Sequence, residues 1–498
     1  MSAFVLIVSI FSLLTSCEDN PTGLLPNNQH WGHATSEDLY HWVDQPIAIY
    51  PPTSDSQVFS GCAVIDVDNT SGFFPDQTNG VVAIYTLNSP RGQVQEIAYS
   101  CDGGYTFTRF AGNPVIDIGS SSFRDPKVIW HADTKRWVMV VARSSEFLIA
   151  IYTSPDLKVW THTSDFSHRG LLGLEYECPN LVRIPLRDPS GSGPDQGDMY
   201  VLTISVNFGS PQGGSTMQYF PGTFDGTDFT PVDGATRFME FGKDSYAAQF
   251  FYGTPDGEDV LLLSWAANAQ YAALVPSAQE GWRGAMTLPR RMFLTNASQD
   301  PAGWNLVTLP VDPSSVFDTR PSATTHKAWN GNATVEIDLS TIPSGAFYFE
   351  ICATAIRDLA APSVDGKDVG AVLTFTLSSL SSDESLSGGF LFALGYAFID
   401  RSGTRGFANP LFTDKFSTSV APPEDGIWRL SAVFDRSILE VFLNGGAANA
   451  TVLAYPQMPL TRMAIDSKGL PAEAGVTVTV HGLEGIWSQN GVSGYSRP

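Results

Sequence analysis

A short turn sequence recurs in the first half of the chain. Residues 36–42 read SEDLYHW and residues 154–160 read SPDLKVW, with looser copies at 100–107 (SCDGGYTF) and 224–229 (FDGTDF). Each copy follows an apolar, β-branched segment, and its Asp or Gly turn precedes an aromatic residue that opens the next segment. The spacing of the copies suits four strands plus turns, which indicates the blades of a β-propeller. The alternative is that S-x-D-x-x-x-aromatic is merely a common hairpin turn.

The remaining pattern predicts an all-β chain with two domains. Segments such as 81–87, 137–142 and 200–205 are rich in β-branched and aromatic residues, and no stretch has a sustained helical period. After about residue 291 the turn sequence stops. We therefore predict a propeller over residues 1–309 and a Pro-rich polar linker over 310–322.

The C-terminal part alternates apolar and polar residues. Examples are TVEIDL at 334–339, LTFTL at 373–377 and ILEVFL at 438–443. Such alternation gives each strand one buried face and one solvated face, which is typical of a β-sandwich. We predict this domain over residues 323–498.

Composition limits the classes of partner. The 498 residues are 43% hydrophobic, so the chain can bury more than one core, and disorder is excluded. There are 51 acidic and 28 basic side chains, and the formal net charge of −23 would repel nucleic acids and anionic membranes. Neutral, hydroxyl-rich ligands are not repelled, and 12% aromatic residues offer flat apolar faces for them. The composition therefore favours a carbohydrate ligand.

The N-terminus and the cysteines indicate export. Residues 1–16 include an apolar run that is too short to span a membrane and has the length of a signal-peptide core, and no later segment is predicted to cross a membrane. A lipoprotein cleavage site at Cys17 and a buried strand are the alternatives. Five scattered cysteines form no metal or redox motif, and N-x-[ST] triplets lie at Asn69, Asn296, Asn332 and Asn449. We predict a secreted glycoprotein.

Two carboxylates stand out as candidates for chemistry, because the sequence has no zinc-type histidine pattern, P-loop, dinucleotide fingerprint or nucleophile elbow. Asp125 lies between Arg124 and Lys127 at a strand entry, and the Arg neighbour predicts an ionised Asp. Glu177 is flanked by Tyr, Cys and Pro, where desolvation would favour the protonated form that a general acid needs. Each alone is more often a surface residue. Converging from successive inner strands, the two would suit a glycosidase.

An ordered set of motifs makes the chain resemble glycoside hydrolase family 32, with the secreted invertases (β-fructofuranosidases) as the nearest likeness. The motifs are WGHATSEDL at 31–39, FSG at 59–61, FRDPK at 123–127, ECP at 177–179, FGKDSYA at 241–247, GWR at 281–283, LPR at 288–290 and DRSILEVFLN at 435–444. The resemblance implies a five-bladed β-propeller followed by a β-sandwich. It also implies a retaining hydrolase of terminal β-D-fructofuranosides in sucrose or short fructans, without metal or organic cofactor.

The resemblance also implies roles for individual residues. Asp125, with Arg124 beside it, would stabilise the transition state by binding fructose hydroxyls, and Glu177 would be the acid/base. Phe59, Ser60 and Trp265 would line the fructose pocket. The pair Lys243-Asp244 would lie near the pocket rim, with a structural role.

One departure from the family concerns the nucleophile, which in the family is the Asp of an Asn-Asp-Pro-Asn-Gly motif at the start of the first blade. Here the apolar run takes that place. Asp19, in the sequence DNPTG at 19–23, is a weak candidate, and its register argues against it. We therefore expect an incomplete first blade. The alternatives to hydrolysis are a fructoside-binding propeller without a nucleophile and a fructosyltransferase.

Overall fold

The computed structural model describes residues 4–8, 28–188, 196–277, 284–296, 303–356, 359, 363, 369–421, 423 and 425–486. The chain divides into two compact units. The first comprises Met1–Glu37, Val43–Met239 and Lys243–Leu306, and the second Asp38–Trp42, Glu240–Gly242 and Val307–Pro498. Nearly all regular structure is β-strand, which confirms the predicted all-β class.

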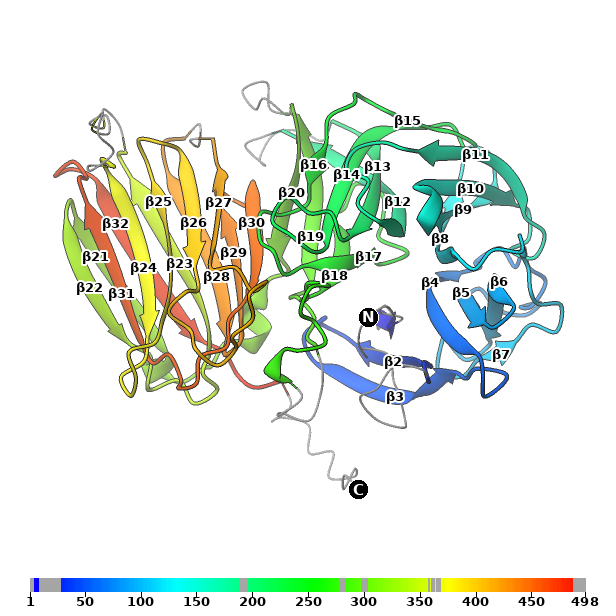
Figure 1. The fold of residues 1–498 in the computed structure, drawn as a ribbon, viewed down its shortest axis with the longest axis horizontal. Helices are drawn as coiled ribbons and strands as arrows, with labels where there is room; N and C mark the ends of the chain where they lie inside the picture. Colours follow the sequence, from blue (N-terminus) through cyan, green and yellow to red (C-terminus); the bar gives the residue numbers. More distant parts are fainter. Residues whose placement is uncertain are drawn as a thin grey trace. The chain divides into compact units, whose positions relative to one another are not determined.

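The first unit is a β-propeller (Figure 1). Its described strands form five blades: β1 (Phe4–Val8), β2 (Trp31–Ser36), β3 (Trp42–Ile49); β4 (Gln57–Ile65), β5 (Val81–Ser89), β6 (Gly92–Ser100), β7 (Thr108–Arg109); β8 (Phe123–His131), β9 (Arg136–Arg143), β10 (Leu148–Ser154), β11 (Thr161–Ser167); β12 (Glu175–Arg187), β13 (Asp198–Asn207), β14 (Thr216–Phe224), β15 (Phe229–Pro231), β16 (Arg237–Phe238); β17 (Tyr246–Phe250), β18 (Val260–Trp265), β19 (Arg290–Asn296), β20 (Trp304–Pro310). A short 3-10 helix, η1 (Ser144–Glu146), joins β9 to β10. A short parallel pairing of β12 with β19 joins the last two blades into one sheet.

The repeated turn joins β2 to β3, β6 to β7, β10 to β11 and β14 to β15, one pair of strands in each of four blades. Asp156 Oδ1 accepts hydrogen bonds from the second and third following backbone N–H groups at 3.0 and 2.8 Å, and Asp38 Oδ1 makes the same contacts at 3.0 and 2.8 Å. The indole N–H groups of Trp160 and Trp42 close both turns on a backbone carbonyl at 2.9 and 2.8 Å. In the looser copies, Asp225 Oδ1 binds the second and third following backbone N–H groups, and Asp102 Oδ1 binds the third and fourth. The predicted propeller repeat is confirmed.

This match also shows which strands of the first blade are described. The turn joins β2 to β3, so these strands correspond to the third and fourth strands of the other blades, and β1 corresponds to the second. A counterpart of the innermost strand is not among the described residues. β1 pairs antiparallel with β2 without a register shift, from Phe4 opposite Ser36 to Val8 opposite Gly32, so part of the apolar run forms a strand. Asp19 lies outside the described residues.

The second unit is a β-sandwich, as predicted. Its strands are β21 (Thr324–Asn330), β22 (Ala333–Asp338), β23 (Ala346–Thr354), β24 (Val372–Ser378), β25 (Ser385–Leu391), β26 (Tyr396–Asp400), β27 (Lys415–Ser419), β28 (Trp428–Asp435), β29 (Ile438–Leu443), β30 (Ala448–Leu453), β31 (Arg462–Lys468) and β32 (Gly475–Gly482), preceded by the 3-10 helices η3 (Pro313–Val316) and η4 (Pro321–Ala323). The sheets run β21-β32-β23-β28-β29-β30 and β22-β31-β24-β25-β26-β27.

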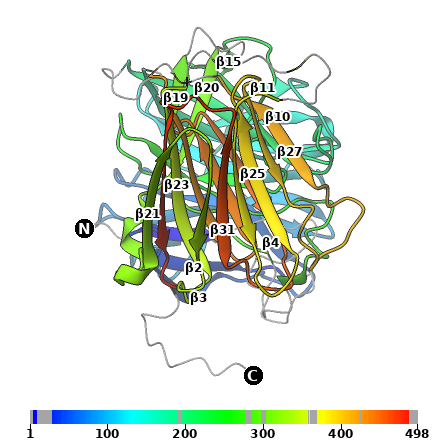
Figure 2. The ribbon, with the colours of Figure 1, turned by 90° about the vertical axis from the view of Figure 1, so that its left-hand side faces the viewer.

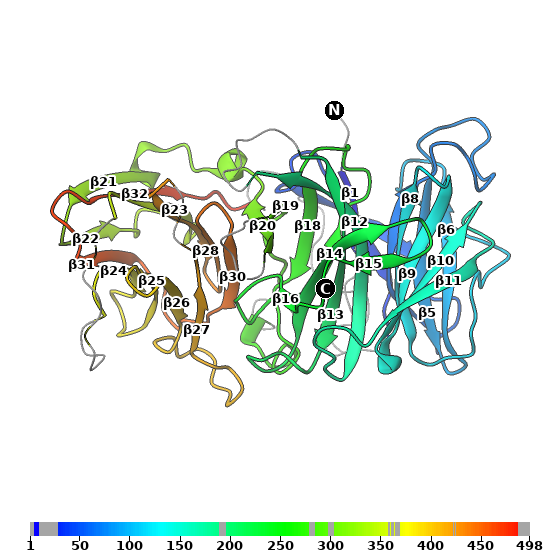
Figure 3. The same ribbon diagram turned by 90° about the horizontal axis from the view of Figure 1, so that it is seen from above.

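Figure 3 shows the two sheets of the sandwich as facing layers, and Figure 2 shows their strands side by side. Alternate residues of β24 are buried, and Leu373, Phe375 and Leu377 enter a core shared with Phe349 and Ile465 of neighbouring strands. The period-2 pattern that predicted the sandwich therefore marks its inward face. Within the described ranges, no helix is long and apolar enough to cross a membrane.

Candidate active site

The innermost strands of four blades share one irregularity. The pairing register shifts once in each of β4, β8, β12 and β17, where the inner strand advances by three residues while the neighbouring strand advances by two. Each of these shifts is a β-bulge. The bulges span Val58 to Gly61, Arg124 to Lys127, Glu177 to Asn180, and Tyr246 to Gln249. Bulges re-aim side chains and are frequent beside active sites. The residues singled out from the sequence on β4, β8 and β12 fall at equivalent places in their blades.

Backbone strain accompanies three of these bulges. The first bulged residue has a positive φ in each, 67° at Asp125, 43° at Cys178 and 53° at Ala247. Residues with a Cβ rarely adopt this conformation, and it persists where the surrounding structure fixes it. The strain recurs at equivalent positions of three blades, so it is a regular feature of the candidate site.

Glu177 is held from both sides by the corresponding residues of neighbouring blades. Its side chain is fully buried. Oε1 accepts from Arg124 Nε at 3.2 Å and from Arg124 Nη2 at 2.7 Å, and Oε2 accepts from the Tyr246 hydroxyl at 2.6 Å. Arg124 also binds Glu175 Oε2 at 2.8 Å. The side chain is thereby held through both carboxyl oxygens, which fixes the position of a candidate acid/base.

Asp125 lies next to this line of contacts. Its backbone N–H donates to Thr86 Oγ1 at 3.1 Å, and its Oδ2 accepts from the Cys178 backbone N–H at 3.0 Å, so the bulges of two blades are bonded together. Oδ1 is buried and has no hydrogen-bond partner among the described residues. An unpaired buried acceptor of this kind is suited to a ligand hydroxyl.

The predicted ionisation of Asp125 is wrong. Burial raises the pKa of Asp125 to about 8 against the opposing effect of Arg124, and the negative charge of Glu177 raises it further. The sequence places the Asp between two cations, but neither binds its carboxylate: Arg124 turns to Glu175 and Glu177, and Lys127 Nζ binds the Phe250 carbonyl. Adjacency in the sequence did not give contact, because the bulge between Arg124 and Lys127 re-aims the side chains and both cations bind groups on other blades.

Phe59 and Ser60 form the bulge of β4, and both are buried. The Phe59 carbonyl accepts from Trp31 Nε1 at 3.0 Å, so the Trp-Gly-His motif fixes the backbone beside the bulge. Gly61 is required here, since a Cβ would lie 2.0 Å from the Ile84 carbonyl oxygen. The FSG motif therefore forms the bulge of β4 and fixes its backbone conformation.

Trp265 is the neighbour of Tyr246 across the β17–β18 pair. Its side chain is buried, and its Nε1 has no hydrogen-bond partner among the described residues. The register brings Trp265 to the strand level of the bulges, one strand outward. Asp19, the remaining candidate from the sequence, lies outside the described residues.

Tyr246, Glu175 and Thr86 were missed from the sequence. Tyr246 lies in the FGKDSYA motif, in which the resemblance implied a role only for Lys243 and Asp244, near the pocket rim. Its equivalence to Arg124 and Glu177, one residue before a bulge, is visible only in the strand pairing. Within the described ranges, no group of three or more His, Cys, Asp or Glu side chains is arranged to hold a metal ion.

Comparison with known proteins agrees with this geometry. The model of the glycosyl hydrolases family 32 N-terminal domain matches residues 18–305, and that of the family 32 C-terminal domain matches residues 311–482. The chain belongs to glycosyl hydrolase family 32. Members similar to it include an extracellular exo-inulinase of Meyerozyma guilliermondii, 40% identical over 85% of this chain and 80% of that protein, and invertase 2 of Saccharomyces cerevisiae, 38% identical over 84% and 80%.

Among solved structures of family 32, the fructofuranosidase from Schwanniomyces occidentalis complexed with fructose superimposes with a TM-score of 0.82. It is 35% identical, and the match covers 93% of this chain and 92% of that one. As a family 32 member, the chain is a glycosidase of the fructoside-hydrolysing type. Propeller and sandwich are the architecture of this family.

Proposed function

We propose that the propeller site cleaves terminal β-D-fructofuranosides of sucrose or short fructans, with Glu177 as acid/base and Asp125 as the residue that binds the fructosyl unit. One observation carries the proposal: a fully buried Glu177, oriented on both oxygens, lies beside Asp125, which has an unpaired buried oxygen. Phe59, Ser60 and Trp265 supply apolar and polar walls near the same level.

The mechanism is a double displacement. A carboxylate attacks the anomeric carbon of fructose while Glu177 protonates the departing glucosyl oxygen, and the fructosyl unit stays bound to the attacking carboxylate. Glu177 then takes a proton from water, which releases fructose and restores both carboxyl groups. Asp125 binds hydroxyls of the fructosyl ring as positive charge develops on it. Tyr246 and Arg124 act through Glu177 as positioning residues.

The family resemblance assigns the attacking carboxylate to the innermost strand of the first blade. That strand is not among the described residues. Asp19 remains the weak candidate. β1 itself reads FVLIV and offers no carboxylate. The second candidate function is a propeller that binds fructosides without turning them over.

Sucrose hydrolysis by the full chain and by Glu177→Gln and Asp19→Ala variants tests the assignment. We expect Glu177→Gln to lower the rate by about 10²–10⁴-fold, because the departing glucosyl oxygen then lacks its proton donor. Normal hydrolysis by Glu177→Gln would overturn the acid/base role. Loss on Asp19→Ala would overturn the register argument against Asp19. Saturable sucrose binding without product by the unmodified chain would establish the second candidate.

We also propose that the protein is secreted and glycosylated at Asn332. This residue is exposed in the turn between β21 and β22, whereas Asn449 lies buried in β30 and has only 4% of its surface exposed. An oligosaccharide needs an accessible Asn amide. Secreted protein from a yeast host should shift in mass on endoglycosidase treatment, and Asn332→Gln should reduce the shift while Asn449→Gln leaves it unchanged. An unaltered shift in Asn332→Gln would contradict the assignment.

A further inference from the structure

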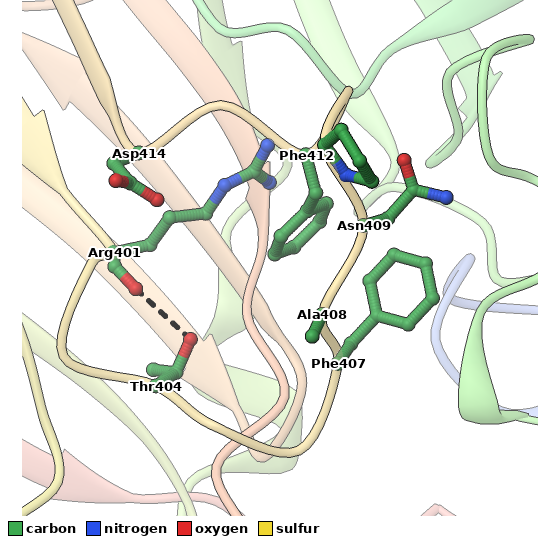
Figure 4. Close-up of a pocket in the computed structure, with 8 residues that line it drawn as sticks. Arg401, Thr404, Phe407, Ala408, Asn409, Phe412 and Asp414 are labelled. Carbon is green, nitrogen blue, oxygen red and sulfur yellow. Dashed lines mark hydrogen bonds between the residues drawn. The ribbon is translucent and has the colours of Figure 1, made fainter.

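The sandwich unit contains a pocket of about 480 Å³ beneath the loop that joins β26 to β27 (Figure 4). Small-molecule sites in proteins typically have about 300–1,000 Å³. The lining residues all come from this loop: Arg401, Thr404, Phe407, Ala408, Asn409, Pro410, Phe412 and Asp414. Long loops of this kind within a compact domain are more often functional than incidental.

Buried ionic side chains hold the loop in place. The buried Arg401 guanidinium lies 3.4 Å from the centroid of the Phe412 ring and donates to the Thr413 and Leu453 carbonyls at 2.8 and 2.7 Å. On the other side, the buried Glu384 carboxylate accepts from the Arg405 backbone N–H at 2.9 Å. A pocket fixed in advance loses little entropy when a ligand binds.

The pocket offers one aromatic face with polar groups beside it. Figure 4 shows the Phe407 ring next to the Asn409 carboxamide. Phe407 is braced by Phe412 and Tyr455, with centroids 5.0 and 5.8 Å away. Asn409 Oδ1 accepts from the Leu411 backbone N–H at 2.8 Å, which fixes the amide and leaves its NH₂ as the donor for a ligand. Asp414 adds a carboxylate acceptor.

This set of groups fits a neutral sugar ring. The apolar face of a sugar packs on an aromatic ring, while its hydroxyls need both donors and acceptors, which Asn409 and Asp414 supply. Anionic ligands are not favoured, because the Asp414 carboxylate lines the pocket, whereas the Arg401 guanidinium is buried and already donates to two backbone carbonyls. We propose that this pocket is an accessory binding site for a fructosyl unit of a fructan chain. The identity of the sugar rests on the proposed function, and the pocket chemistry does not.

Calorimetric titration of the full chain with a linear fructan tetrasaccharide tests the proposal. An Asp125→Asn background weakens the propeller site, and the part of the remaining binding that a substitution in the pocket removes reports the sandwich. Adding Asn409→Asp keeps the acceptor for Leu411 but removes the donor, and should lower the remaining association constant about fivefold, the effect of losing one hydrogen bond. Adding Phe407→Ala should lower it about tenfold or more. Tyr396→Ala, an exposed aromatic of β26, is the matched control and should change nothing.

The outcomes separate this proposal from the proposed function. Two results would overturn the accessory site and leave the proposal of fructoside hydrolysis untouched. One is that the Asp125→Asn chain binds no fructan, and the other is that adding Asn409→Asp or Phe407→Ala leaves its affinity unchanged. Equal binding of a maltotetraose would overturn the assignment to fructan. Remaining binding that depends on Asn409, in a chain that never hydrolyses sucrose, would support the accessory site and refute the proposed function.

Discussion

Replacing Arg124 by Met tests how much the buried ion pair between Arg124 and Glu177 stabilises the propeller. Arg124 donates to Glu177 at 3.2 and 2.7 Å, and the exposed fractions of the two side chains are 5% and 0%. Removing one partner of a buried pair leaves the other charge uncompensated and costs about 3–5 kcal/mol. The contact with Glu175, whose side chain is 29% exposed, adds at most about 1 kcal/mol.

Scanning calorimetry is the suitable assay, because it records the unfolding transitions of a chain with two compact units directly. A loss of about 3–5 kcal/mol should lower the melting temperature of the propeller by about 6–15 °C and leave that of the sandwich unchanged. In a Glu177→Gln background the same substitution should be nearly harmless, since no buried charge is then left alone. If Arg124→Met destabilises both backgrounds equally, the pairing does not carry this energy and the reasoning is wrong.

Three further predictions concern the bulge level of the propeller. Tyr246→Phe removes the 2.6 Å hydrogen bond to Glu177 and should lower kcat for sucrose about tenfold or more with little change in KM; a selective rise in KM would contradict a positioning role. Because burial raises the pKa of Asp125 to about 8 from 3.8, the folded state holds the extra proton between these values, and stability should fall as pH rises through this range. Asp125→Asn should make the melting temperature depend less on pH between pH 5 and 8, and an unchanged pH dependence would refute the raised pKa. Gly61→Ala, which places a Cβ 2.0 Å from the Ile84 carbonyl oxygen, should cost about 1–3 kcal/mol or more in denaturant unfolding, whereas Gly234→Ala, with open space around it, should be nearly neutral.

The sequence predicted the blades well because their turns are local. An Asp that binds the backbone two and three residues ahead needs only its own neighbours, so SEDLYHW and SPDLKVW carry the whole turn. The sandwich was equally readable from the alternation in strands such as β24. The motif order gave Glu177 and Asp125 through resemblance.

The contacts of the site could not be read in this way, because they join residues far apart in the chain. Glu177 and Tyr246 are 69 positions apart, and their hydrogen bond depends on two bulges that no local pattern marks. The ionisation of Asp125 depends on burial by several blades, which outweighs the Arg beside it in sequence. The strand formed by part of the apolar run was one of three open interpretations, since hydrophobicity alone does not separate a leader from a strand.

The aligned bulges also bear on how this scaffold can change. Each adds one residue to an inner strand, so the side chains at the bulge are released from the alternation that packs one blade on the next. Cys178 and Ala247 nevertheless lie in a hydrophobic core and have a positive φ, so these positions tolerate few larger or β-branched side chains. A library confined to Cys178 and Ala247 should therefore yield few folded variants, and one of equal size at exposed positions of the same strands should yield many. The irregular level of the propeller is the part that evolution and design can vary least freely.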